Sequence, residues 1–184
     1  YVTESPIFVG PLLADFNGDG RQDATVVEEG TGEVNLLSLT EPPILWKQAG
    51  TSWNTSGVSV VGDGVLLIGQ GISWLSARDG AVTAHLGISG TEHGVAADLD
   101  GDGVHEAVAQ GFAGLTRVQL GETLKVLWQA PRVVGTEQLA FEDVTSDGVQ
   151  DVFFGDTFSR KRIGVVDGAT GDLVWEQPVA PTHH

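Results

Sequence analysis

The chain has 184 residues, of which 41% are hydrophobic and 18% charged, ordinary proportions for a globular protein with a buried core. Its formal net charge of −16 argues against a nucleic-acid partner, because phosphates repel an acidic surface. The absence of cysteine excludes disulfides, thiolate metal sites and a cysteine nucleophile. No apolar run approaches the roughly 20 residues of a membrane span, so we expect no membrane insertion. The start at Tyr1, without Met or a signal sequence, suggests a mature or excised piece.

An acidic segment occurs three times, at residues 15–23, 98–106 and 143–151. Each copy has oxygen-bearing side chains at positions 1, 3, 5 and 9 and a glycine at position 6. Oxygen ligands on alternate residues, turned back by a glycine, suit a hard cation such as Ca²⁺. The alternative is that the segments are only Asp-Gly or Asn-Gly hairpin turns, which need no metal.

The spacing of the three segments predicts a fourth repeat without a metal. Their starts are separated by 83 and 45 residues, so the first gap has room for one more unit. Asp63-Gly64 lies where that unit's turn is expected, but Ser59, Val61 and Leu67 replace the other ligands. Trp46, Trp128 and Trp175 lie 31, 30 and 32 residues after the first residue of their segments, which supports the same register. The second unit has no Trp there, and we expect Trp53 and Trp74, outside the repeating position, to be surface aromatics.

Each unit reads as four short strands separated by turns rich in Gly, Asp, Asn and Pro. No apolar pattern of period 3.6 lasts for three turns, so helices should be nearly absent. In the first and last units the expected strands are 7–16, 23–28, 33–39 and 44–48, and 138–144, 151–155, 162–167 and 173–176. The first strand of each unit is rich in small residues. In the first unit this strand also contains Pro11, which suits a strand at the edge of its sheet.

Four-stranded repeats of 40 to 45 residues are typical of β-propeller blades. We therefore predict an all-β, single-domain propeller over residues 1–184, with blades at about 7–50, 51–90, 91–133 and 134–180. The alternative is part of a seven- or eight-bladed propeller. A closed four-bladed propeller would be a monomer, whereas two chains that pair into eight blades would form a propeller-completing dimer.

The acidic segments resemble the calcium loops of integrin-α-type propellers, the FG-GAP or VCBS repeat family. An EF-hand or dockerin loop would need an acidic residue at position 12, where this chain has Val26, Ala109 and Phe154. The resemblance covers essentially the whole chain, although the motif that names the family survives only as Phe154-Gly155.

The resemblance implies ligands for up to three Ca²⁺ ions. In the first loop these are the side chains of Asp15, Asn17, Asp19 and Asp23 with the carbonyl of Arg21. In the second they are Asp98, Asp100, Asp102 and Glu106 with the carbonyl of Val104. In the third they are Asp143, Thr145, Asp147 and Asp151 with the carbonyl of Val149. Glu106 replaces the usual Asp, and Thr145 is a neutral ligand.

These features favour a non-catalytic, calcium-stabilised module for adhesion, ligand binding or spacing. The low affinities typical of extracellular calcium modules favour a secreted or cell-surface protein. The family resemblance implies a protein or glycan ligand. The alternative is a carbohydrate-active enzyme or lectin domain, but the sequence shows no nucleophile–base arrangement and no carboxylate pair beyond the loops, so we expect no enzyme.

Overall fold

The computed structural model describes residues 7–28, 32–38, 44–49, 57–88, 91, 93–112, 114–131, 133, 136–156 and 161–179. Trp53 lies outside these residues. Those described form sixteen strands and no helix, so none of their segments is a helix able to cross a membrane. The prediction of an all-β protein is confirmed.

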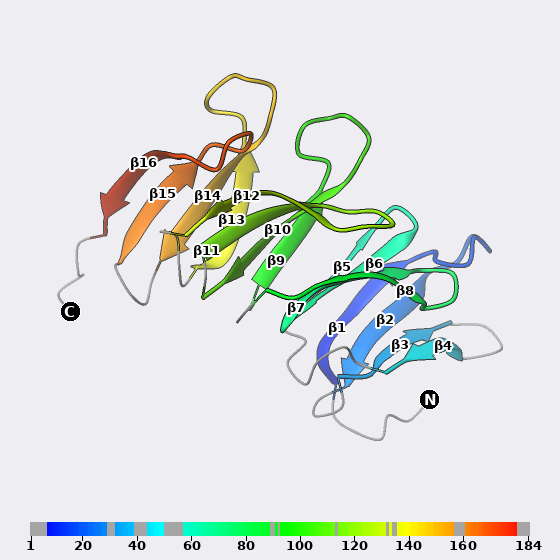
Figure 1. Cartoon of the computed structure of the whole chain (residues 1–184). Coiled ribbons are helices and arrows are strands. Elements are labelled where there is room, and N and C mark those ends of the chain that lie inside the picture. Colours follow the sequence, from blue (N-terminus) through cyan, green and yellow to red (C-terminus); the bar gives the residue numbers. More distant parts are fainter. Residues whose placement is uncertain are drawn as a thin grey trace. The chain divides into compact units, whose positions relative to one another are not determined.

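The strands form four antiparallel sheets of four strands, each a meander in chain order (Figure 1). The first sheet contains β1 (Ile7–Ala14), β2 (Asp23–Glu28), β3 (Val34–Leu37) and β4 (Ile44–Gln48). The second contains β5 (Gly57–Val61), β6 (Gly64–Gly69), β7 (Gly71–Ser76) and β8 (Val82–Leu86). The third contains β9 (His93–Ala97), β10 (Glu106–Gly111), β11 (Gly114–Gln119) and β12 (Lys125–Ala130). The fourth contains β13 (Thr136–Glu142), β14 (Asp151–Asp156), β15 (Arg162–Val166) and β16 (Leu173–Pro178).

The sheets gather into two compact units, Tyr1–Glu92 with Gly121–Leu124, and His93–Leu120 with Lys125–His184. Within the first unit β1 lies against β5, and within the second β9 lies against β13. The first strand of each sheet is thus an edge strand with one hydrogen-bonded neighbour, as its small residues and Pro11 predict. Pro11 falls where the β1–β2 register is irregular, because its missing N–H cannot support a regular ladder.

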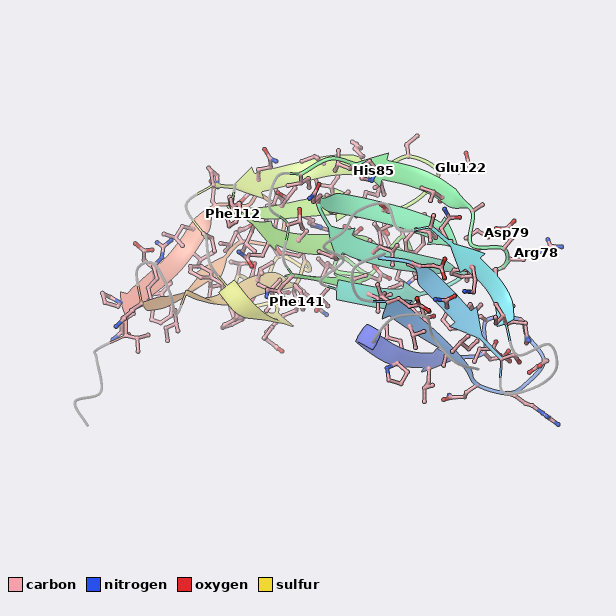
Figure 2. The ribbon with its side chains drawn as sticks, turned by 90° about the horizontal axis from the view of Figure 1, so that it is seen from below. Arg78, Asp79, His85, Phe112, Glu122 and Phe141 are labelled. Atoms are coloured by element: carbon pink, nitrogen blue, oxygen red, sulfur yellow. The ribbon has the colours of Figure 1, made fainter. Side chains whose placement is uncertain are left out.

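The core of each unit lies between its two sheets. In the first unit it includes Leu36, Trp46 and Leu67, and in the second Val108, Leu115 and Phe154. The inner strands β6 and β10 are buried along their whole length; β6 contains only apolar and small residues, whereas β10 also buries Glu106 and Gln110. The hairpin between β10 and β11 carries Phe112 at its surface, 71% exposed (Figure 2).

Tryptophans of the fourth strands join each sheet to the next within a unit. The indole N–H of Trp46 in β4 donates to the carbonyl of Ala77, 2.8 Å away, in the turn that also holds Arg78 and Asp79 (Figure 2). Trp128 in β12 donates in the same way to the carbonyl of Gly168 at 2.7 Å. The rings cover Gly80 and Gly171, where a Cβ atom would come within 3 Å of them. The repeated tryptophan is therefore a packing residue between neighbouring sheets.

The second sheet corrects two details of the sequence interpretation. Its first two strands are joined by only two residues, Gly62-Asp63, whereas eight residues separate the corresponding strands of each other sheet. Ser59, Val61 and Leu67 accordingly lie in β5 and β6, so the metal loop has been replaced by a short hairpin. Trp74 is half-buried and packs against Gly64, so it is no simple surface aromatic.

Candidate metal-binding loops

Each acidic loop joins the first and second strands of a sheet, at 15–22, 98–105 and 143–150. The residue at position 9 is already the first residue of the second strand, and it is almost fully buried: Asp23 0%, Glu106 1% and Asp151 0% exposed. The other loop residues are mostly exposed. Each loop therefore combines one buried carboxylate with an acidic turn that faces solvent.

The first carboxylate of each loop holds the turn together. Asp15 accepts hydrogen bonds from the amides of Gly18 at 2.7 Å, Asp19 at 3.1 Å and Gly20 at 2.8 Å. Asp98 and Asp143 accept equivalent bonds in their own loops. Such bonds from an Asp side chain to the following backbone stabilise turns without any ion. The shape of the loops thus agrees with both the calcium and the hairpin interpretations, and the loops differ in the partners of the buried residue at position 9.

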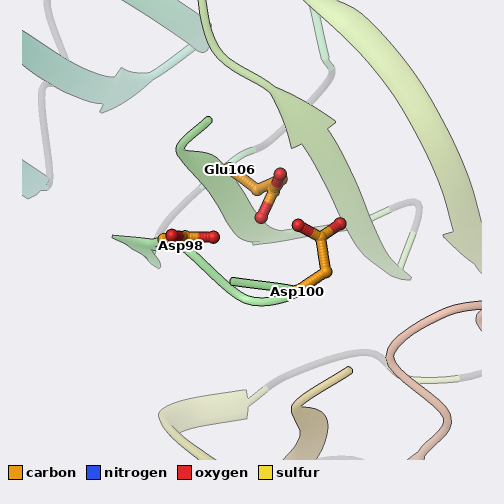
Figure 3. A group of neighbouring side chains, drawn as sticks. All are labelled: Asp98, Asp100 and Glu106. Atoms are coloured by element: carbon orange, nitrogen blue, oxygen red, sulfur yellow. The ribbon is translucent and has the colours of Figure 1, made fainter. Parts of the chain in front are cut away.

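The second loop gathers its carboxylates most closely. Oxygens of Asp98, Asp100 and Glu106 all lie within 4.8 Å of one another (Figure 3), the only such group among the residues that the structure describes. However, a cation is already present, because Arg117 from β11 lies 2.7 Å from Asp100 and 3.2 Å from Glu106. The guanidinium is 3% exposed and also donates to the carbonyl of Gly168 at 2.9 Å.

The electrostatics of Glu106 reflect this crowding. Burial raises the pKa of Glu106 above its ordinary value, and the nearby carboxylate of Asp100 acts in the same direction. The amide of Leu99 and the guanidinium of Arg117 oppose the rise in pKa without cancelling it. Arg117 therefore offsets only part of the cost of holding this carboxylate ionised.

The first loop has no such counter-ion. Asp23 accepts one hydrogen bond, from the amide of Phe16 to Oδ2 at 3.1 Å, and its buried Oδ1 has no partner. In the described part of the chain, no lysine or arginine pairs with Asp15, Asp19 or Asp23. A buried carboxylate oxygen without a donor is unfavourable, and a cation in the loop would supply the missing partner.

The third loop satisfies its buried carboxylate with hydrogen bonds. The amides of Val144 and Thr145 each donate to Oδ2 of Asp151 at 2.9 Å, and the amide of Gly168 donates to Oδ1 at 2.8 Å. Burial pushes the pKa of Asp151 upward, but these bonds and the Thr145 hydroxyl outweigh it and hold the pKa below its ordinary value. Both oxygens of this carboxylate therefore accept hydrogen bonds from backbone amides.

The remaining predicted ligands lie along the loops as the sequence orders them. Asn17 donates to Asp19 at 3.2 Å, so these two side chains bond each other. The amides of Arg21, Val104 and Val149 donate to the carboxylates at position 5 of their loops. The residue that sequence reasoning missed is Arg117. The sequence feature that could have indicated Arg117 is its charge, which lies inside an otherwise uncharged run of residues, 114–119.

A cleft opens beside the first loop, within the first unit. Its walls come from the loop, from the two-residue hairpin of the second sheet and from the turn after β7. The polar side chains among its lining residues are Asp15, Asn17, Asp63, Ser76 and Arg78. The first loop therefore has a buried carboxylate oxygen without a partner and also borders a cleft.

No protein-family model and no curated protein matches the sequence. Solved structures match the fold. The chain has a β-propeller fold. It is similar to BamB from Moraxella catarrhalis (19% identity, TM-score 0.59), to the computationally designed Ika8 protein (14%, 0.63) and to the Cps50 (Swd1) propeller domain of Myceliophteria thermophila (15%, 0.62). Each match covers 95% of this propeller chain, and 52%, 50% and 57% of the other chain respectively. The propeller chain thus spans about half the length of these structures.

Proposed function

We propose that this chain is a non-catalytic, calcium-stabilised propeller module of a secreted or cell-surface protein. In this proposal its loops are of the FG-GAP or VCBS type, and the loop from Asp15 to Asp23 is the principal calcium site. The module presents a protein or glycan ligand-binding surface beside that loop. The observation that carries the calcium part of the proposal is the buried, unpartnered Oδ1 of Asp23.

The physical argument is one of charge and burial. Three carboxylates at positions 1, 5 and 9 share the first loop with no cationic side chain among the described residues paired to them. A divalent cation bound there would neutralise most of that charge and bond the orphaned oxygen. Because the unfolded chain lacks this arrangement, binding would stabilise the fold by mass action.

Calcium is expected to raise the melting temperature. Sites of 10⁻⁴–10⁻³ M affinity in 10 mM Ca²⁺ contribute roughly 1.4–2.7 kcal/mol, which for a chain of this size is a shift of roughly 3–10 °C. Thermal unfolding followed by circular dichroism, in excess chelator and in calcium, measures it. Identical melting temperatures in the two conditions would refute the calcium proposal.

Asp23→Asn is the sharpest variant for this site. The Asn carbonyl can keep the bond from the Phe16 amide, while the buried charge disappears. We therefore expect D23N to be at least as stable as the wild type in chelator but to gain much less from calcium. Asp63→Asn, in the two-residue hairpin of the second sheet, is the matched control and should leave the calcium response unchanged. Calorimetric titration should show the loss of one calcium site in D23N alone.

The ligand part of the proposal has its own test. A glycan array and a binding screen against extracellular proteins should find a ligand whose binding falls when Arg78, in the cleft beside the first loop, is changed to Ala. Loss of binding with an unchanged calcium response supports ligand recognition at this cleft. A ligand that binds R78A as well as it binds the wild type would place recognition elsewhere on the module.

A further inference from the structure

We propose that Arg117 is the resident cation of the second acidic loop and takes the position that calcium fills in the first. The second loop, despite holding the tightest group of carboxylates, then needs no metal. This inference rests on the proposed calcium function for the contrast between loops. Its counter-ion part stands on the geometry around Arg117 alone.

The contacts of the guanidinium leave little room for a competing ion. Its NH2 group lies 2.7 Å from Asp100 and 3.2 Å from Glu106, while NH1 donates to the carbonyl of Gly168 in the adjacent sheet. The contact to Asp100 has the length of a charge-assisted hydrogen bond, and the longer contact to Glu106 is an ion pair. Only 3% of the Arg117 side chain is exposed, so its charge is held away from solvent. The planar guanidinium therefore cross-links two loop carboxylates and fixes them to the next sheet.

The first and third acidic loops have no arginine at the position that corresponds to Arg117. Arg117 pairs across the ladder with Val108, the residue two positions after the buried Glu106. In the first and fourth sheets the corresponding third-strand residues are Leu36 and Val165. An apolar side chain there cannot neutralise the loop. Among these three equivalent positions, only that of the second loop carries a cation.

A calcium ion entering the second loop would have to displace Arg117 from both carboxylates. The displaced guanidinium would remain buried with only the Gly168 carbonyl as a known partner, and an uncompensated buried charge is strongly unfavourable. Calcium at the first loop meets no such competitor. Among these two loops the wild-type chain should therefore bind calcium at the Asp15 loop alone.

Arg117→Gln tests the proposal, with the full chain as the sample. In chelator we expect the melting temperature to fall by about 10 °C, because Asp100 and Glu106 lose their counter-ion. In calcium much of that loss should be recovered, and titration calorimetry should count one more bound Ca²⁺ than in the wild type. Adding Asp102→Asn to this variant should remove the extra ion.

Two controls separate this effect from simple loss of a buried arginine. Arg162→Gln removes another buried guanidinium, which pairs with Glu176 and lies over the Phe154 ring, outside any acidic loop. R162Q should lose stability without gaining a calcium site. Asp102→Asn in the wild-type background should leave the number of bound ions unchanged.

The possible outcomes are distinct. If D102N alone removes a bound calcium, or if R117Q binds no more calcium than the wild type while the first loop binds it, the inference is wrong and the proposed function stands. If no variant binds calcium, the proposed function fails, and the counter-ion role is judged in chelator. In chelator, the double variant R117Q/D100N should have a higher melting temperature than R117Q, because one of the two carboxylates without a counter-ion is removed. Equal melting temperatures would overturn the counter-ion role of Arg117.

Discussion

Replacing Trp128 with alanine is expected to lower the free energy of unfolding by roughly 3–5 kcal/mol, the usual cost of deleting a buried aromatic side chain. The ring is 7% exposed, belongs to the core of the second unit and covers Gly171. Its loss opens a cavity between the third and fourth sheets that the rigid strands cannot close. Denaturant unfolding followed by circular dichroism and fluorescence measures the change.

Two controls define what the ring contributes. Trp128→Phe keeps most of the apolar contact and removes the indole N–H, but the Gly168 carbonyl still accepts a bond from Arg117. Its cost should therefore be clearly smaller than that of W128A. Trp175→Ala removes the equivalent ring of β16, which is 45% exposed, and should also cost less. Equal losses for W128A and W175A would contradict a packing role that depends on the neighbouring sheet.

Replacing Asp151 with asparagine is expected to cost roughly 2–4 kcal/mol at neutral pH. The carboxylate accepts bonds from the amides of Val144, Thr145 and Gly168, and a bond to a charged group contributes about 1.5–3 kcal/mol net. An Asn side chain offers one acceptor oxygen and turns its NH₂ group toward a donor. Chemical denaturation at pH 7 checks the size of the loss.

The same variant should change the pH dependence in a defined direction. Because the pKa of Asp151 in the folded chain lies below its ordinary value of 3.8, its contribution is present above that value and is lost as the pH falls through the lowered pKa. The stability difference between the wild type and D151N should therefore shrink in strong acid. A difference that stays constant from pH 7 to pH 2 would show that the charge of Asp151 contributes nothing.

Much of the fold was predictable because it follows from local patterns. The repeated acidic turns and tryptophans gave the register of the sheets, and the observed strands begin and end within about two residues of the predicted ones where the prediction specified them. The metal-free second repeat was also predictable, since Ser59, Val61 and Leu67 are strand residues rather than ligands. Its two-residue hairpin was not, because Asp63-Gly64 also fits a longer loop.

The partners of the buried carboxylate in each loop could not be read from the loop residues. By charge alone the loop at Asp98 holds the most carboxylates and is the most attractive site for calcium. What separates the loops is a partner outside the motif: Arg117 across the ladder in one, the Gly168 amide in another, and no partner for Oδ1 of Asp23 in the first. Such partners depend on strand pairing and on the adjacent sheet, which a nine-residue motif does not encode.

The peptide groups of Gly168 couple the third and fourth sheets to each other. Its carbonyl accepts bonds from Arg117 and Trp128 of the third sheet, while its amide donates to Asp151 of its own sheet. The amide of Gln150 also donates a hydrogen bond to the carbonyl of Leu99, between the loops of the fourth and third sheets. Opening either sheet breaks bonds that the other needs, so the two sheets should unfold as one cooperative element. In repeat architectures stability comes partly from the interface between a repeat and its neighbour, and these bonds belong to that interface.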